Sequence, residues 1–520
     1  MIEKYTFASL MRVNTNLLYL LLTLGLILFV FSLYQRIPNI DDAWIGEQVF
    51  WLSEDGVVKN VLMKNYSDNQ NGLLAYHKAF VYSGLWAVQL FGFSLGILKS
   101  VSLFYLVVFG AIFYYYLVKL KKILNVKQFL FVALLLLIES HIFEYSFVFR
   151  PEIMLMSTGF LSFAFLEHSF KTKKNKTLFI LLSAIFAGLS ALVHLNGAVF
   201  VLAGGLILLF KKQFKSLTWF TLVGFVFVFL YFSHLNSFSD VSVWFYHLMA
   251  YDSGKSDVGF GFVTLLNILL KPFEEHFRYF HSLKEIALTL LLITTLFFGF
   301  KTIKQKMPLL LPYVLILVLA LGFIAPGKTA KYLIPFIPFF SLMVIIFVTD
   351  AWQTVSRKQI FIPKTKEAIS IFIVLILFVG VSFAYDGYLS SKKFEPKTNK
   401  SITEQFVKKP IKETIILAPM TFIFDEIYDY KEIIGLMSFN ERLKTNAKIA
   451  SPQFFEITEN ENIDYILINQ HYIEKFNLGS LNIGSTAGNY LVVGKSDGLT
   501  ILELEAGIKS QESGIRIPKR

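Results

Sequence analysis

The feature that most constrains this chain is a series of apolar runs that fills most of its length. A helix needs about 20 apolar residues to cross the roughly 30 Å hydrocarbon layer of a membrane. Most of the runs approach that length, and together they predict about eleven transmembrane helices. The predicted spans are 17–34, 99–118, 128–148, 152–169, 177–194, 197–210, 216–234, 284–300, 308–325, 331–349 and 368–386.

Composition divides the chain into two parts. Charged residues make up 17% of the sequence, against roughly 25% in soluble proteins, and the deficit lies in residues 1–387. Residues 388–520 have an ordinary soluble composition. We therefore predict a polytopic α-helical membrane domain followed by a small α/β domain. Within the latter, residues 414–424, 463–469 and 490–494 are predicted strands, and 425–437 and 452–461 are candidate helices.

The positions of the basic residues predict the orientation. Lys and Arg beside transmembrane helices are retained in the cytoplasm, and five alternate connections are basic and almost free of carboxylates. The N-terminus is then cytoplasmic, while loops 35–98 and 235–283 and the tail lie outside, if 73–95 is an interfacial helix. The connections contain Lys119, Lys121, Lys122 and Lys127; Lys171, Lys173, Lys174 and Lys176; Lys211, Lys212 and Lys215; Lys301, Lys304 and Lys306; Arg357, Lys358, Lys364 and Lys366.

Three further properties limit the functional classes. The net charge of +12 would suggest a nucleic-acid partner in a soluble protein, but here it follows from membrane topology, and no nucleic acid is expected. The absence of cysteine excludes disulfides and thiolate-bound metals. Leu17–Tyr34 is too long for a signal-peptide core and lacks a small-residue cleavage site, so it is predicted to be an uncleaved first helix.

Two neighbouring aspartates, Asp41 and Asp42, follow the first span and precede the amphipathic stretch Ala43–Ser53. Carboxylates stabilise helix N-termini, so these residues could cap that stretch. Polar groups next to a membrane domain are also functional candidates. Both interpretations can hold, with one residue capping and the other facing a cavity.

Five ionisable residues gather around the outer end of the third predicted span. His141 and Glu144 would share a helix face, and none of the five can face lipid cheaply. The cluster is therefore either an internal ion-pair network or the wall of a polar cavity, and the concentration of charge favours the cavity. Its members are Glu139, His141, Glu144, Arg150 and Glu152.

Two more outer positions carry polar groups. His194 and Asn196 lie at the turn between two spans, where a histidine is more often structural than catalytic. Lys328, Lys331 and Tyr332 lie at the outer mouth of the tenth span. Lysines there fit an anionic ligand such as phosphate, or ordinary snorkelling to the interface.

Four segments, in order and all on the predicted outer side, together resemble the GT-C-type glycosyltransferases. This group includes the protein O-mannosyltransferases and the aminoarabinose transferase of lipid A, and the resemblance covers most of residues 15–350. The segments are Asp41-Asp42-Ala43-Trp44, Phe91-Gly92 with Lys99, Arg150-Pro151-Glu152-Ile153-Met154, and Lys331-Tyr332-Leu333-Ile334-Pro335-Phe336-Ile337-Pro338.

The resemblance implies transfer of a sugar from a polyprenyl-phosphate donor to a hydroxyl of a glycan, lipid or protein, at the outer face of a bacterial inner membrane. It implies catalytic roles for Asp41, Asp42 and Glu152, with Asp41 aligned to the proposed base. Two departures are that Asp42 replaces the more usual Glu, and that Leu74–Lys78 replaces a Lys-Pro-Pro-Leu signature. The expected donor-phosphate ligands are Lys331, Arg150 and Lys78, and the expected cavity residues are His141, Glu144, His194, Asn196 and Tyr332.

Two functions from other classes remain as alternatives. A transporter or flippase of lipid-linked sugars would also have many spans and a polar cavity, although no paired hydrophobic halves suggest inverted repeats. A non-catalytic assembly factor could use the tail to bind partners. No nucleotide-binding, metalloprotease or nucleophile-elbow motif occurs, and the sequence leaves the donor sugar, the acceptor and any divalent metal undetermined.

Overall fold

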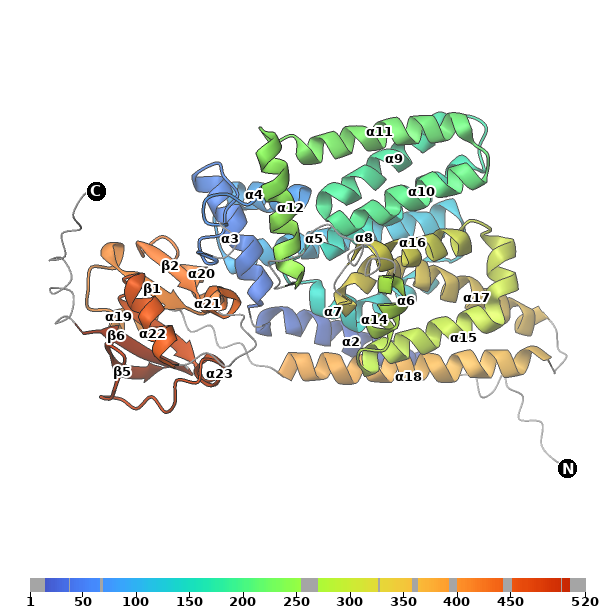
Figure 1. Ribbon diagram of the computed structural model, residues 1–520. Coiled ribbons are helices and arrows are strands. Elements are labelled where there is room, and N and C mark those ends of the chain that lie inside the picture. The colour runs from blue at the N-terminus through green and yellow to red at the C-terminus, as the bar shows by residue number, and fades with distance from the viewer. Residues whose placement is uncertain are drawn as a thin grey trace, which may run out of the picture.

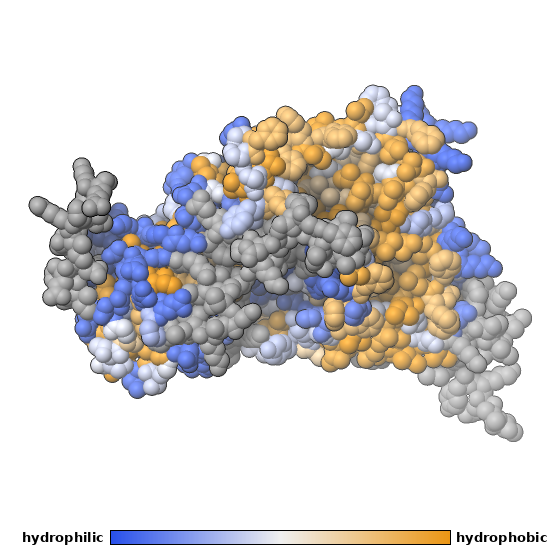
Figure 2. Space-filling model, in the orientation of Figure 1, coloured by the Kyte–Doolittle hydropathy of each residue, from blue (hydrophilic) through white to orange (hydrophobic). Residues whose placement is uncertain are grey.

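The computed structural model describes residues 15–36, 38–65, 69–253, 270–325, 328–357, 363–391, 400–442, 451–496 and 498–505. It is a long bundle of apolar helices that carries a small sheet domain at one end (Figure 1). On the face that Figure 2 shows, hydrophobic side chains cover most of the bundle, and hydrophilic ones gather towards its ends. This surface is the one that a multi-pass membrane protein presents to lipid.

Each of the eleven predicted spans overlaps a described helix. Six are long and apolar enough to cross a membrane, four are shorter apolar helices, and α8 is central and mostly buried. The eleven are α2 (Thr15–Gln35), α5 (Leu95–Tyr114, continued by the π-helix η1, Tyr115–Leu120), α6 (Val126–Leu137), α8 (Glu152–Ser169), α9 (Lys176–Val193), α10 (Ala198–Phe210), α11 (Phe214–Phe232), α15 (Leu283–Lys306), α16 (Leu310–Ile324), α17 (Ile337–Arg357) and α18 (Pro363–Ser391).

The third predicted span, 128–148, is wrong as a single helix. Helix α6 ends at Leu137, and a separate short helix, α7, covers Ser140–Tyr145. The Glu139 carboxylate accepts a hydrogen bond from the Ile142 backbone N–H at 2.9 Å and so caps α7. Without a proline or glycine at the break, the hydrophobic pattern carries no sign of it. Glu139 is therefore a helix cap at the end of the bundle, and not a residue deep inside a helix.

The interfacial helix predicted within residues 73–95 is α4 (Lys78–Phe91). Its 14 residues extend over about 21 Å at roughly 1.5 Å per residue, well short of the hydrocarbon layer. Trp86, Leu90 and Phe91 are largely exposed along it. The helix is not among the long or shorter apolar helices that could form spans, and its place at the membrane interface stays a prediction.

Four of the five basic connections meet at one end of the bundle. Lys121, Lys171 and Lys306, from three of them, line one pocket. Lys176 Nζ, from the same connection as Lys171, donates to Gln213 Oε1 at 2.6 Å. This contact places the turn between α10 and α11, which is the fourth basic connection, at the same end. The fifth connection, with Arg357, Lys358, Lys364 and Lys366, lies outside the residues whose side chains are described. The predicted grouping is thus confirmed for those four.

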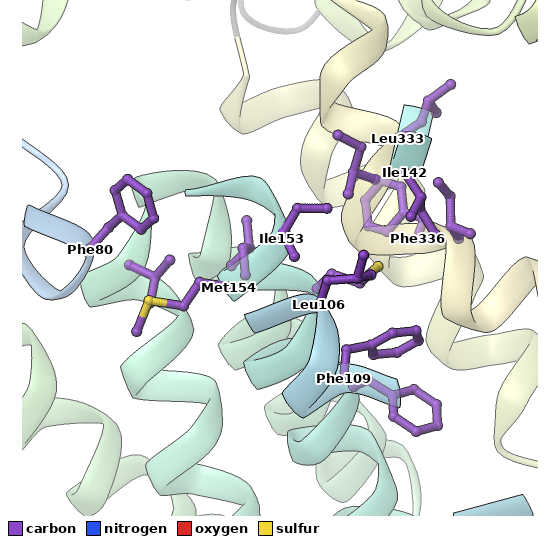
Figure 3. Close-up of a cluster of buried hydrophobic side chains, with 14 of the residues drawn as sticks. Phe80, Leu106, Phe109, Ile142, Ile153, Met154, Leu333 and Phe336 are labelled. Atoms are coloured by element: carbon purple, nitrogen blue, oxygen red, sulfur yellow. The ribbon is translucent and has the colours of Figure 1, made fainter. Parts of the chain in front are cut away.

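Helix α8 forms the centre of the bundle, and nearly all its residues are buried. Side chains of α4, α5, α7, α8 and the 3-10 helix η4 (Ala330–Phe336) meet in one apolar cluster (Figure 3). This core holds five elements in place relative to one another. The labelled members are Phe80, Leu106, Phe109, Ile142, Ile153, Met154, Leu333 and Phe336.

The two long loops that the sequence predicts on the outer side are also partly helical. Helix α3 (Ile40–Glu54) precedes α4 in the first outer loop. The second outer loop contains α12 (Phe238–Ser253), η3 (Lys271–Glu275) and α14 (His276–Tyr279). Residues 254–269 of that loop lie outside the described residues.

The C-terminal domain is a six-stranded mixed sheet with short helices, as predicted for an α/β domain. The strand order is β2-β1-β3-β6-β5-β4, with β2, β1 and β3 parallel and the others antiparallel. The last membrane helix continues to Ser391, beyond the boundary that composition placed at residue 387. The strands are β1 (Ile415–Ala418), β2 (Glu432–Gly435), β3 (Tyr465–Asn469), β4 (Thr486–Ala487), β5 (Tyr490–Ser496) and β6 (Leu499–Leu504).

The predictions for the tail are confirmed in part. Residues 452–461 fall on α22 (Ser451–Asn460), but 425–437 is not one helix. It contains strand β2 between two short helices, because Glu432–Gly435 pairs with β1. The remaining helices are α19 (Lys400–Phe406), η5 (Ile411–Glu413), η6 (Met420–Phe422), α20 (Ile423–Glu426), α21 (Leu436–Arg442) and α23 (Gln470–Lys475).

The C-terminal domain docks on the first outer loop. The Gly435 N–H donates to the Leu62 carbonyl at 2.9 Å, and Ser438 Oγ donates to the Lys64 carbonyl at 2.8 Å. Lys64 Nζ also pairs with the Glu432 carboxylate at 2.7 Å. The sheet domain thus holds residues 62–64 through backbone and side-chain contacts.

Glu47 connects that docked segment to α3. Its buried carboxylate accepts hydrogen bonds from the Val61 N–H (2.7 Å), the Leu62 N–H (3.0 Å), Asn60 Nδ2 (3.1 Å) and Trp51 Nε1 (3.0 Å). A buried carboxylate with several donors is stable, whereas its loss would leave those donors unpaired. Docking of the tail therefore bears directly on the position of α3.

We expect Gly435→Ala to weaken this docking by about 1–3 kcal/mol, the usual cost of overpacking. A Cβ at residue 435 would lie 2.9 Å from the Leu62 carbonyl oxygen, which belongs to the backbone and cannot rotate away. Hydrogen exchange at residues 61–64 should accelerate at least fivefold. Gly387→Ala in α18 is the control, since its Cβ would meet nothing within 4 Å. Equal exchange in both variants would show that the close approach is unimportant for docking.

Candidate active site

The two aspartates lie in the first turn of α3, and the structure separates their roles. Asn39 is the N-cap, and its side chain accepts from the Asp41 N–H at 2.9 Å. The Asp42 carboxylate returns the contact by accepting from the Asn39 N–H at 2.7 Å, which completes a capping box. Of the two roles predicted for the aspartates, helix capping is therefore the role of Asp42.

Asp42 also fastens α3 to the helices behind it. Its carboxylate accepts from the Phe149 N–H at 2.6 Å and lies 3.4 Å from Lys99 Nζ. The Asp42 side chain is completely buried. With these contacts filling its carboxylate, Asp42 positions α3 against α5 and the turn before α8, and it is not exposed to a substrate.

Asp41 points instead to Arg150, which lies in the turn before α8. Arg150 Nη1 forms an ion pair with Asp41 Oδ2. The same guanidinium binds Glu152 through Nε (3.0 Å to Oε2) and Nη2 (2.6 Å to Oε1). Glu152 is fully buried, whereas the Asp41 side chain is 23% exposed. Only the Asp41 carboxylate of this triplet is therefore open to an incoming hydroxyl.

The two oxygens of the Asp41 carboxylate differ in their contacts. Among the described residues, no hydrogen-bond donor is assigned to Asp41 Oδ1, while Oδ2 is held by Arg150. One oxygen thus fixes the orientation of the carboxylate, and the other remains able to accept a proton. This is the geometry that a positioned general base requires.

Lys331 adds a second cation to the cluster. It begins the first turns of η4 and lies near enough to Arg150, Asp41 and Glu152 to interact electrostatically with all three. None of the described carboxylates forms an ion pair with Lys331 within 4.0 Å. Whereas Arg150 is shared between two carboxylates, Lys331 is the cation of this cluster that no described carboxylate holds in an ion pair.

An aromatic group borders these charges. The rings of His77 and His194 stack at 4.5 Å, and Tyr332 meets His194 edge-on at 5.4 Å. Burial lowers the pKa of His77 to about 4, and burial beside that ring holds the pKa of His194 well below its usual value. Both rings are therefore neutral near pH 7. Asn196 lies next to them, with its N–H donating to His194 Nδ1 at 2.9 Å.

Sequence reasoning missed His77 and selected its neighbour Lys78. The chain turns at the start of α4, so that His77 faces His194 whereas Lys78 points the opposite way. Lys78 Nζ donates to the Leu230 carbonyl at 2.8 Å and contacts Ser233 Oγ at 3.1 Å, where it caps the end of α11. Lys78 is thus not brought to the Asp41 cluster. A Lys-Pro-Pro-Leu signature would have fixed the alignment of this segment with the family and so could have shown that Lys78 lies away from the Asp41 cluster.

His141 and Glu144 belong to a second polar cluster between α7 and α15. His141 contacts the Glu139 carboxylate at 2.7 Å and the Glu285 carboxylate at 3.0 Å. Glu144 pairs with Lys284 at 2.6 Å. For these two residues the ion-pair alternative describes the structure, and they are not placed beside Asp41. The five-residue cluster seen in the sequence is divided between two sites.

Lys328 is likewise engaged elsewhere. Its Nζ lies 2.7 Å from the Glu275 carboxylate, which also binds Arg278 Nε at 3.0 Å. Arg278 is fully buried and donates to the Thr329 carbonyl at 2.7 Å. This network ties η3 and α14 to the segment before η4.

No group of three or more His, Asp or Glu side chains suited to a metal ion occurs within the described ranges.

No protein-family model matches this chain, and no curated protein does. Several solved structures are similar. ArnT from Cupriavidus metallidurans, bound to undecaprenyl phosphate, aligns with a TM-score of 0.55 at 11% identity, over 95% of this chain and 99% of that one. The oligosaccharyltransferase of Archaeoglobus fulgidus in its apo form aligns with a TM-score of 0.53 at 11% identity, over 87% and 70%.

The archaeal enzyme, AglB, has also been solved with an inhibitory peptide and a dolichol-phosphate. That structure aligns with a TM-score of 0.51 at 13% identity, over 86% of this chain and 69% of the other. ArnT, a lipid A aminoarabinose transferase, and AglB are both GT-C proteins. At these identities the likeness concerns the fold, and it confirms the architecture expected from the four sequence segments. The chain has the fold of the GT-C membrane glycosyltransferases.

Proposed function

We propose that this protein is a glycosyltransferase that moves a sugar from a polyprenyl-phosphate carrier to an acceptor hydroxyl. The proposal depends on the Asp41 carboxylate, in which Arg150 holds one oxygen and the other has no assigned donor among the described residues. Lys331 lies close enough to interact with it electrostatically, and the surrounding fold is that of the GT-C proteins. Structures with this fold have been solved with undecaprenyl phosphate and with a dolichol-phosphate. A phosphate-linked lipid donor is consistent with the cations of this site.

In the proposed reaction the acceptor oxygen bonds to the anomeric carbon of the sugar as the bond from that carbon to the phosphate oxygen breaks. Asp41 Oδ1 takes the proton of the acceptor hydroxyl, a step typically worth roughly 10²–10⁴-fold. The electron pair of the broken bond stays on the phosphate. Lys331 and Arg150 would stabilise that developing charge in a partly dry site.

The remaining residues would position these groups. Glu152 orients the Arg150 guanidinium through two contacts, and Asp42 fixes the start of α3. The neutral stacked pair His77 and His194, with Tyr332, offers flat surfaces of the kind on which sugar rings pack. We place the site on the extracytoplasmic side of a bacterial inner membrane, because the lysine-rich connections lie at the other end of the bundle.

The test is transfer by the purified full-length protein in detergent, supplied with a panel of polyprenyl-phosphate sugars and hydroxyl acceptors. Detergent removes the two compartments, so a flippase or an assembly factor would give no product. Product from at least one donor, lost in the Asp41→Asn variant, supports the proposal. Efficient flipping in vesicles without transfer from any donor would contradict it.

Lys331→Met should lower transfer by about 10²-fold, the usual cost of losing one group that stabilises developing charge. Lys78→Met is the matched control, since Lys78 Nζ is bound at the end of α11, and we expect a change of no more than about twofold. Initial rates with one lipid donor measure both, and Lys331→Arg should recover part of the activity. A larger loss of transfer in Lys78→Met than in Lys331→Met would show that Lys78, and not Lys331, acts on the donor phosphate.

A further inference from the structure

At the end of the bundle opposite the candidate active site, basic connections enclose a pocket of about 300 Å³. Four lysines line it, although they come from three separate connections. Lys121 and Lys122 follow η1, Lys171 follows α8, and Lys306 ends α15. The positive-inside pattern explains lysines at this end of the molecule, but it does not explain their convergence on one concave site.

The charges around this pocket do not balance. The Glu167 carboxylate, almost completely buried, pairs with both Lys121 and Lys171, and these two ammonium groups repel each other. Lys306 pairs with Asp350 at 3.0 Å. No described carboxylate pairs with Lys122. Burial and the neighbouring Lys171 lower the pKa of Lys121 to about 7. Even without the charge of Lys121, the other three lysines outnumber the two carboxylates, and an anion would neutralise that excess.

The rest of the pocket lining is mostly apolar. Besides the lysines, the lining consists of Ile123, Met307, Ile346 and Thr349, of which Met307 and Ile346 are almost completely buried. A soluble anion would gain nothing from the apolar lining, whereas a phosphate attached to glycerol and acyl chains would use both kinds of lining. The pocket also lies where the apolar helices end, at the depth of lipid headgroups. Basic pockets between membrane helices suit lipid phosphates for this reason.

We propose that this pocket binds the phosphate of an anionic phospholipid from the leaflet at that end of the bundle. Lys122, together with Lys171 from the shared Glu167 contact, binds the phosphate, and the half-buried Ile123 borders the glycerol. The site is separate from the proposed sugar-transfer site and does not depend on it. It is a structural lipid site that joins the ends of η1, α8 and α15.

The test uses the full-length protein in a neutral detergent, titrated with dioctanoyl phosphatidylglycerol while thermal unfolding is followed. A ligand that binds the folded state raises the unfolding temperature as its concentration exceeds Kd. The wild type should be stabilised by phosphatidylglycerol and not by dioctanoyl phosphatidylcholine. Lys122→Gln/Lys171→Gln should bind about 30-fold more weakly, since each lysine near an anionic lipid contributes roughly fivefold. This pair leaves the Lys121–Glu167 contact intact.

The matched control is Lys211→Gln/Lys212→Gln. It removes the same charge from exposed residues that do not line the pocket, so its affinity should stay within about threefold of wild type. Thr349→Glu tests the site without removing a lysine. Thr349 lines the pocket, its hydroxyl bonds only to carbonyls of its own helix, and a carboxylate there should block the lipid. The Asp41→Asn variant should bind phosphatidylglycerol like the wild type.

Three results would overturn the proposal. The first is equal binding by wild type, Lys122→Gln/Lys171→Gln and Thr349→Glu. The second is equal stabilisation by phosphatidylcholine and phosphatidylglycerol. The third is saturation by inorganic phosphate at the concentrations effective for the lipid, with the same sensitivity to the variants, since the ligand would then be a soluble phosphate.

Discussion

Replacing Asp41 by Asn should abolish sugar transfer, with a loss of at least 10²-fold, while the protein remains folded. The amide can still accept the Arg150 hydrogen bond at one oxygen, but it cannot take the proton of the acceptor hydroxyl. Asp41 caps nothing by its own side chain, because Asn39 and Asp42 form the capping box of α3. The expected change is in turnover, measured with saturating lipid-linked sugar, and not in the unfolding temperature.

Asp55→Asn is the matched control for this experiment. Asp55 lies at the other end of α3, is exposed, and pairs with Lys59 on the surface, where ion pairs contribute little. It should retain the wild-type rate and stability. Wild-type turnover by Asp41→Asn would refute the base assignment, and equal losses in both variants would indicate a general effect of charge in the first outer loop.

The second large effect concerns Arg150. Arg150→Gln should destabilise the protein by about 3–5 kcal/mol, because it leaves the fully buried Glu152 carboxylate without its cation. It should also remove transfer, since the guanidinium both orients Asp41 and stabilises the departing phosphate. Thermal unfolding in detergent measures the first consequence, and the transfer assay measures the second.

A double variant separates these two roles. In Arg150→Gln/Glu152→Gln the buried charge is gone and two amides can hydrogen-bond, so most of the lost stability should return. Transfer should stay absent, because no guanidinium remains near Asp41. If transfer returned together with stability, Arg150 would be a structural residue only, and Lys331 would be the sole cation of the proposed phosphate site.

The docking of the tail gives the C-terminal domain a structural connection to this chemistry. The sheet binds residues 62–64, Glu47 binds residues 60–62 to α3, and the first turn of α3 carries Asp41. Displacement of the C-terminal domain would therefore shift residues 62–64 and, through their contacts with Glu47, the helix that carries Asp41.

The number of spans, their separation from the tail and the grouping of four basic connections all follow from the amino-acid sequence alone. These are local properties: the length of an apolar run decides whether a helix can cross a membrane, and lysines near its ends decide its direction. The same reasoning placed Asp41, Arg150, Glu152, His194, Asn196, Tyr332 and Lys331 on one side, and the structure brings these residues together.

Only the tertiary structure decided which of those polar residues meet. Asp41 and Arg150 are 109 residues apart in the sequence, and nothing local distinguishes the pairing of Asp41 from that of Asp42. The break at Glu139, the opposite directions of His77 and Lys78, and the lysine pocket likewise depend on partners from distant helices. Charge and hydrophobicity along a chain determine the depth and side of a residue, whereas its partner is determined by how the helices pack against one another.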